Sequence, residues 1–228
     1  MEKLVYLCWK RPELSIEAFR SRWLEQTADA VLAAGARSLT LNVADLGDSI
    51  ARCPLVIGDG AEWSACVSLW IDCIDTRGTI ERAILHSSSR VAAYLVTESA
   101  PQRWVGRDWP DRQRSPGATL VTAFPKPDRL SDEQFYGHWH GSHSVLTAEI
   151  HPFRQYIRNS VARRLTPEAT AYRGIVEERV AELEDATDMM RLFRGSLDNI
   201  RKGIADVDAF LDRAQISATL MSEYILAS

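Results

Sequence analysis

The sequence predicts an α+β fold in which one arrangement of strands and helices occurs twice along its 228 residues. Three observations support this prediction. Short apolar runs rich in β-forming residues alternate with segments of helical period. A helix-start signal followed by spaced aromatic residues recurs at a matched offset in both halves. A segment without periodicity separates the halves. Each half follows the order strand, helix, strand, strand, helix, strand, which is that of a ferredoxin-like unit.

The first predicted unit covers residues 1–98. Its first helix follows Ser15, which can cap the helix, while Phe19 and Trp23 mark one apolar face. Gly35 is a plausible end of this helix. The other elements predicted here are strands at 3–9, 38–44, 63–73 and 91–97, a helix at 76–86, and a loop at 45–62 that is rich in Gly and Pro.

A linker is predicted at residues 99–116, and the second unit at 117–228. Strands are expected at 118–124, 153–161 and 216–226, and helices at 131–149 and 187–204, with an extension of the last helix to 213 left open. The segment 174–185 is ambiguous. Val176, Val180 and Leu183 also suit a helix, but the position of the segment in the repeat favours a strand.

Composition excludes several classes of function. A formal charge of −4 gives no basic surface for nucleic acid. No apolar run is long enough to cross a membrane, and the apolar run near the N-terminus is too short for a signal peptide. The cysteines form no C-x-x-C pair, so we expect reduced thiols, no metal centre and a cytoplasmic location. The expected partner is a small-molecule substrate, with a homodimer left open.

The repeat is asymmetric at one position. Ser15, Phe19 and Trp23 align with the second-half residues Ser131, Phe135 and Trp139, and Asn42 roughly with Asn159, but the next helical step is Thr27 in the first half and His143 in the second. Packing explains the aromatic residues in both copies. It does not explain an ionisable ring in only one of them, which indicates one working site and one structural copy.

The pattern F-x-x-x-W-x-x-x-H followed by Y-x-x-N resembles the EthD family. The matching residues are Phe135, Trp139, His143, Tyr156 and Asn159. The resemblance implies two tandem ferredoxin-like units that form an intrachain dimeric α+β barrel. It also implies small-molecule chemistry: cofactor-free cyclases, decarboxylases and dehydratases, some monooxygenases, and haem binding elsewhere in the superfamily. Fold analogy alone does not choose between them.

His143 is the candidate general acid and base, because an imidazole can take and give a proton near neutral pH. The alternative is a hydrogen-bonded core histidine. His140, three residues earlier on the helix, is close enough to share the site. His138, five residues earlier, is a poorer neighbour. A straight helix spreads the three rings too widely to bind a metal together, so no metal is expected.

Further candidates surround this histidine. Tyr156 could donate to a developing oxyanion as a second catalytic residue, and Arg158 could hold a carboxylate. Glu178, on a strand face, could be a second acid or base or could orient the histidine, and a solvated face is its alternative. The predicted substrate-binding residues are Tyr136, Trp139, His140, Arg158, Asn159 and Glu178.

We therefore expect a cofactor-independent enzyme of lyase or cyclase type, acting by decarboxylation, dehydration or cyclisation on an aromatic or polyketide-like compound. Two alternatives remain open. One is a monooxygenase or haem-binding enzyme on the same fold. The other is a non-catalytic protein that binds a hydrophobic ligand.

Overall fold

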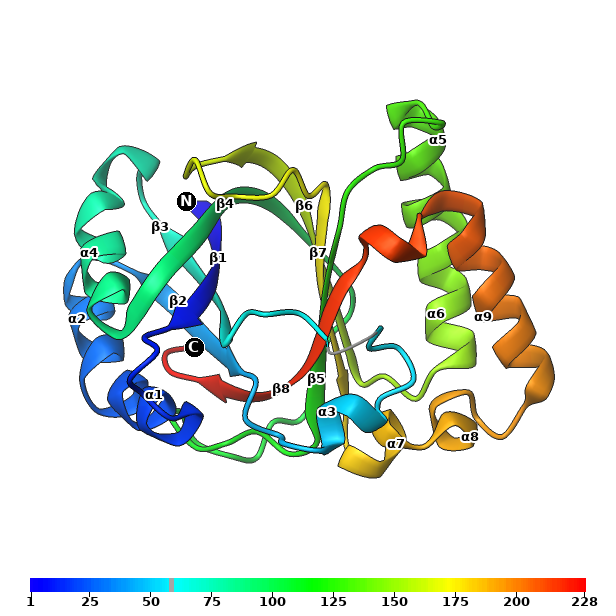
Figure 1. The fold of residues 1–228 in the computed structure, drawn as a ribbon, viewed down its shortest axis with the longest axis horizontal. Helices are drawn as coiled ribbons and strands as arrows, with labels where there is room; N and C mark the ends of the chain where they lie inside the picture. Colours follow the sequence, from blue (N-terminus) through cyan, green and yellow to red (C-terminus); the bar gives the residue numbers. More distant parts are fainter. Residues whose placement is uncertain (58–59) are drawn as a thin grey trace.

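The computed structural model describes residues 1–57 and 60–228. In these residues eight strands form a closed barrel with helices on its outside (Figure 1). The strands are β1 (Glu2–Lys10), β2 (Arg37–Val43), β3 (Ala65–Ile71), β4 (Ser88–Gln102), β5 (Ala118–Phe124), β6 (Gln155–Arg164), β7 (Gly174–Val180) and β8 (Ser217–Ile225).

Around the barrel the order is β1-β3-β2-β8-β5-β7-β6-β4, and every pair of neighbours is antiparallel. The strands of each half of the chain are adjacent to one another. Two seams join the halves: β2 pairs with β8, and β4 pairs with β6. The second seam is long because β4 continues to Gln102, into the predicted linker.

The predicted fold class is corrected by these seams. We expected two tandem ferredoxin-like units, with two sheets that face each other to form an intrachain dimeric α+β barrel. The described chain instead forms one closed antiparallel barrel of eight strands, so the halves share a single sheet. The physical reason is the edge strands. A separate four-stranded sheet would leave unpaired N–H and C=O groups at its edges, and closing the barrel satisfies them.

Helices cover two opposite sides of the barrel (Figure 1). On the first-half side lie α1 (Ile16–Arg22), the π-helical segment η1 (Trp23–Thr27), α2 (Ala28–Ala33) and α4 (Gly78–Ser87). On the second-half side lie α5 (Asp132–Tyr136), the π-helical segment η3 (Gly137–His143), α6 (Ser144–Ile150) and α9 (Leu197–Phe210). Shorter helices are α3 (Ser49–Arg52), α7 (Leu183–Thr187) and α8 (Met189–Leu192).

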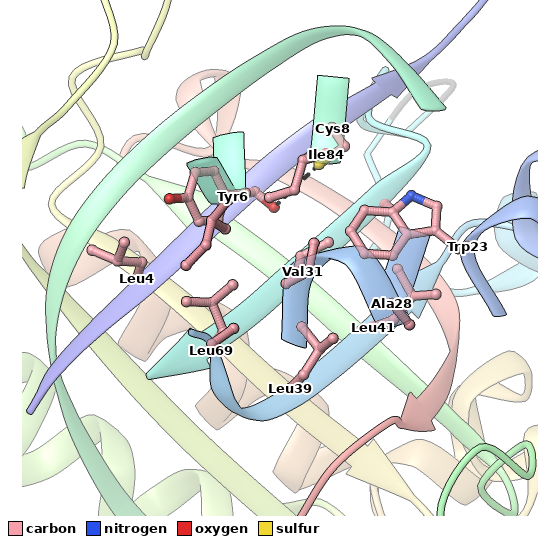
Figure 2. Close-up of a cluster of buried hydrophobic side chains, with 14 of the residues drawn as sticks. Leu4, Tyr6, Cys8, Trp23, Ala28, Val31, Leu39, Leu41, Leu69 and Ile84 are labelled. Atoms are coloured by element: carbon pink, nitrogen blue, oxygen red, sulfur yellow. Dashed lines mark hydrogen bonds between the residues drawn. The ribbon is translucent and has the colours of Figure 1, made fainter. Parts of the chain in front are cut away.

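The core beneath the first-half helices is tightly filled. Side chains alternate across a strand, so Leu4 and Tyr6 of β1 point outward to the helices and belong to one buried cluster with Trp23 and Ile84 (Figure 2). Val5 of the same strand points inward. Burial of such apolar area is the main favourable term in folding.

The barrel interior is part apolar and part polar. Val5, Val121, Ile175 and Met221 from both halves pack in one cluster. Nearby, Glu177 accepts hydrogen bonds from the side-chain amides of Asn42 and Asn159, each at 3.1 Å. The two asparagines aligned by the sequence repeat thus meet on one carboxylate. Buried polar groups of this kind are stable only when they are paired.

Several local predictions can be compared with the structure. The ambiguous segment 174–185 begins as strand β7 and then turns into α7 at Leu183. The predicted loop at 45–62 contains the short helix α3, and its Gly58 and Asp59 lie outside the described residues. No described helix combines the length and apolarity needed to span a bilayer.

Candidate active site

A cavity of about 370 Å³ lies between the outer face of the second-half strands and the helices that cover them. This volume is in the range of small-molecule sites. The sheet contributes Leu120, Thr122, Phe124, Tyr156, Val176 and Glu178 to its wall; the helical side contributes Trp139, His143, Leu146, Thr147, Ile150, Ile200, Ile204, Asp206 and Val207; the first half contributes Pro54, Leu55 and Ile57. The wall is mainly apolar with a few convergent polar groups.

Two histidines of the π-helical segment meet one carboxylate of α9. His143 Nδ1 lies 2.5 Å from Asp206 Oδ2, and His138 Nε2 lies 2.8 Å from Asp206 Oδ1. We expected His138 to be a poor neighbour of His143, and this was wrong. The i→i+5 hydrogen bonding of a π-helix adds a residue to the turn and brings positions five apart onto one face.

The negative charge on Asp206 determines which ring nitrogen of His143 carries a proton. Burial alone would raise the pKa of Asp206, but the hydrogen bonds from His143 and His138 outweigh burial and hold this pKa below its usual range. An ionised carboxylate only accepts hydrogen bonds, so Nδ1 of His143 carries a proton. In a neutral ring, Nε2 then has the free lone pair. Its neighbour is Thr147 Oγ1 at 3.3 Å.

Aromatic packing holds the two histidine rings. The ring of Phe210, at the end of α9, lies 5.0 Å from the His138 ring and 4.9 Å from the His143 ring, centroid to centroid. Phe210 is fully buried. The rings therefore have little freedom to turn away from Asp206. In the described chain no group of three or more His, Cys, Asp or Glu residues has a metal-binding arrangement.

Trp139 and Tyr156 both line the cavity and contact each other. Trp139 Nε1 donates to the hydroxyl oxygen of Tyr156 at 3.3 Å, and both side chains are buried. Burial raises the pKa of Tyr156, so its phenol stays protonated. Both residues were predicted to belong to the site, and both line the cavity with His143.

Glu178 is the polar residue on the sheet side. It lies in β7, is 8% exposed, and makes no side-chain hydrogen bond or ion pair with the part of the chain that the structure describes. Burial raises its pKa to about 8. The carboxylate that faces the barrel interior is that of Glu177, since adjacent residues of a strand point to opposite faces.

Four predicted contact residues lie elsewhere. Asn159 points into the barrel interior and bonds to Lys3 and Glu177. Arg158 donates to Ser144 Oγ at 2.7 Å. Neither side chain lines the cavity.

His140 and Tyr136 pack against each other outside the cavity, with ring centroids 5.4 Å apart. The His140 ring has Ser160 Oγ as a distant neighbour at 3.5 Å, and burial, aided by the charge of Arg158, lowers its pKa. Although His140 is three residues from His143, its ring packs against Trp139 and Tyr136 and does not line the cavity. These two residues are therefore not brought together with His143.

Sequence reasoning missed Asp206. A signal was present, because Ile200, Gly203, Val207 and Phe210 recur at helical spacing and Asp206 falls within that apolar stripe. A single carboxylate on a buried face is unusual unless it is paired. Its partner, His143, is 63 residues away in the chain.

The first-half counterpart of His143 makes a structural contact. Thr27 is buried, and its Oγ1 lies 2.5 Å from Ser87 Oγ of α4. The equivalent helical segment therefore contacts α4 through a small hydroxyl pair. This difference matches the asymmetry seen in the sequence repeat.

Comparison with solved structures shows which fold this is. An anthrone oxidase-like protein matches over 100% of this chain and 93% of its own, with a TM-score of 0.57 and 13% identity. A proposed monooxygenase of Lactobacillus acidophilus matches over 99% and 96%, with a TM-score of 0.53 and 6% identity. One of Fusobacterium nucleatum matches over 98% and 91%, with a TM-score of 0.51 and 8% identity. At these identities the likeness concerns the fold alone.

Comparison of sequences locates a family in the second half. No curated protein matches the chain, but residues 127–214 match the EthD domain. That range contains the capped helix, the π-helical turn and α9, and with them His143, Tyr156, Glu178 and Asp206. The family resemblance read from the sequence is confirmed for this segment. The matched segment covers less than half of the chain and carries the histidine–aspartate pair.

Proposed function

We propose that the chain is an enzyme that oxidises an apolar, aromatic or polyketide-like small molecule, with His143 as the general base. The observation that carries the proposal is the pairing of His143 with the half-buried Asp206 at the wall of an apolar cavity. The descriptions of its structural relatives as anthrone oxidase-like and monooxygenase proteins favour oxidation over the lyase chemistry expected from the sequence.

His143 would act through Nε2. Because Asp206 holds the proton on Nδ1, Nε2 can accept a proton from a substrate that displaces the long contact to Thr147. Asp206 would stabilise the imidazolium that results. The step suits a carbon acid that is conjugated with a carbonyl group, as in an anthrone, whose enolate dioxygen can attack. One oxygen atom then remains as a carbonyl at that carbon and the other leaves as water, which balances the oxidation of CH₂.

A test uses anthrone as the probe substrate. Wild-type protein in aerated buffer should consume dioxygen and form the quinone, followed by an oxygen electrode and by absorbance. His143→Ala should lower turnover by about 10²- to 10⁴-fold, the usual contribution of a general base. His86→Ala, at an exposed position on α4, is the matched control and should keep full activity.

The same experiment distinguishes the proposed oxidation from the alternative functions. Turnover without dioxygen uptake would favour the lyase or cyclase reading, and a Soret band in the purified protein would favour haem binding. Equal oxidation rates for wild type and His143→Ala would refute the role of His143. A cavity that binds apolar ligands and turns over none would identify a binding protein.

A further inference from the structure

Two adjacent glutamates of β7 have opposite environments. Glu177 faces the barrel interior, where Asn42 and Asn159 donate to it at 3.1 Å each and Lys3 Nζ lies at 3.8 Å. Glu178 faces the cavity and has no such partner among the described residues. Its backbone neighbours across the sheet are Leu120 and Tyr156. The carboxyl group is thus buried beside the cavity without a partner among the described residues, and it is available to a ligand in the cavity.

The physical consequence is a neutral carboxyl group. Removing an unpaired carboxylate from water costs far more free energy than protonating it, so such a group keeps its proton. In agreement with this, burial raises the pKa of Glu178 to about 8. In its protonated form the group has an O–H donor, and no described residue accepts a hydrogen bond from it.

The charges around the cavity do not supply a counter-ion. The ionisable groups that face Glu178, or lie near it, from the surrounding elements are Cys53, His143, His151, Tyr156, Asp206 and Arg213. The one guanidinium among them, that of Arg213, pairs with Asp208 at 2.6 Å. Asp206 pairs with His138 and His143. Burial lowers the pKa of His151 to about 4, which keeps that ring neutral. A ligand carboxylate would therefore find no free cation in the described part of the cavity.

We infer that Glu178 is a second catalytic residue of the proposed reaction, a neutral carboxylic acid that donates a hydrogen bond to the carbonyl oxygen of an uncharged ring compound. This inference rests on the proposed function. His143 removes the proton from the helical side, the electron pair moves to the carbonyl oxygen, and Glu178 on the sheet side stabilises the enolate oxygen. A neutral acid opposite a base in an apolar site is an effective arrangement for enolates.

The first experiment needs no substrate. Infrared difference spectra of wild type minus Glu178→Gln should contain the C=O band of a protonated carboxylic acid at neutral pH. The band should disappear as the pH rises through about 8. The exposed Glu184→Gln is the control and should show no such band. A spectrum without the band at neutral pH would overturn the inference.

The second experiment uses 9-fluorenone, a flat ketone that has no acidic C–H to lose and a carbonyl as its only polar group. Wild type should bind it about fivefold more weakly at pH about 9 than at pH about 7, the worth of one neutral hydrogen bond. Glu178→Gln, which keeps a donor but cannot ionise, should bind it equally at both values. Glu178→Leu should bind weakly at both.

Charge selection provides the remaining comparison. The 9-fluorenone carboxylates should bind at least about tenfold more weakly than 9-fluorenone, because no cation receives the anion. Equal affinity for the two, no binding of fluorenone by wild type, or no pH dependence of its binding would each overturn the inference. If these tests succeed but anthrone is not oxidised, the proposed oxidation falls and the neutral-ligand site stands. If His143 proves essential but these tests fail, only the role of Glu178 falls.

Discussion

At the scale of single residues, Asp206 decides which nitrogen of His143 carries the proton. Asp206→Asn keeps the size of the side chain but adds an amide donor, which favours the other tautomer. We expect turnover of anthrone to fall on the order of 10²- to 10⁴-fold. The ¹⁵N chemical shifts of His143 should report the tautomer change. Asp198→Asn, exposed on the same helix, should alter neither quantity. Unchanged ¹⁵N shifts in Asp206→Asn would contradict this role.

The raised pKa of Glu178 leads to a separate prediction about stability. Its pKa is raised from 4.5 to about 8 in the folded protein. Between these values the unfolded chain releases the proton while the folded protein keeps it, so the free energy of unfolding falls as the pH rises. Glu178→Gln removes this loss. The variant should gain stability over wild type from pH about 5 to about 9, by at most a few kcal/mol.

Urea unfolding at several pH values measures this difference. Glu184→Gln should track wild type throughout, because its side chain is exposed. A stability difference between Glu178→Gln and wild type that stays constant with pH would mean that the carboxyl group ionises equally in both states.

At the scale of elements, β7 and the π-helical segment approach so closely that one position must be glycine. A Cβ added at Gly174 would lie 2.5 Å from the Phe124 ring and 2.7 Å from the Trp139 ring, both buried. Gly174→Ala should cost about 1–3 kcal/mol of stability by overpacking. Gly137→Ala, where a Cβ meets nothing within 4 Å, is the control and should be neutral or slightly stabilising. Equal unfolding midpoints for both variants would contradict this packing.

The same elements explain what sequence could and could not predict. The start of the histidine helix was readable because its signal is local: Ser131 and Gln134 form the predicted capping box. The π-helical turn has no comparable signature, so the meeting of His138 with His143 could not be foreseen. Their contact with Asp206 depends on how α9 packs against the turn, a tertiary relation that periodicity alone does not contain.

At the scale of the molecule, the strand order within each half was recoverable from the repeat, but the two seams that join the halves into one sheet were not. Closure depends on the register of β2 against β8 and of β4 against β6, which joins segments far apart in the chain. The two halves of the repeat also differ in how the space beneath their helices is packed. The first half fills the space beneath its helices, whereas the second half keeps a cavity there and lines it with ionisable groups.

The halves are also joined inside the barrel by Lys3, which gives the last prediction. Its Nζ lies 2.7 Å from Glu98 Oε2 and donates to Asn159 Oδ1 at 2.8 Å, close to the buried Glu177. Lys3→Met leaves these groups without their cation and should cost about 3–5 kcal/mol. Adding Glu177→Gln should restore part of the loss, because it removes the buried charge that Lys3 no longer balances. Lys202→Met, at an exposed pair, should change stability by less than about 0.5 kcal/mol. Urea unfolding of the four proteins decides the matter: a Lys3→Met variant as stable as wild type would mean that this network does not hold the halves together.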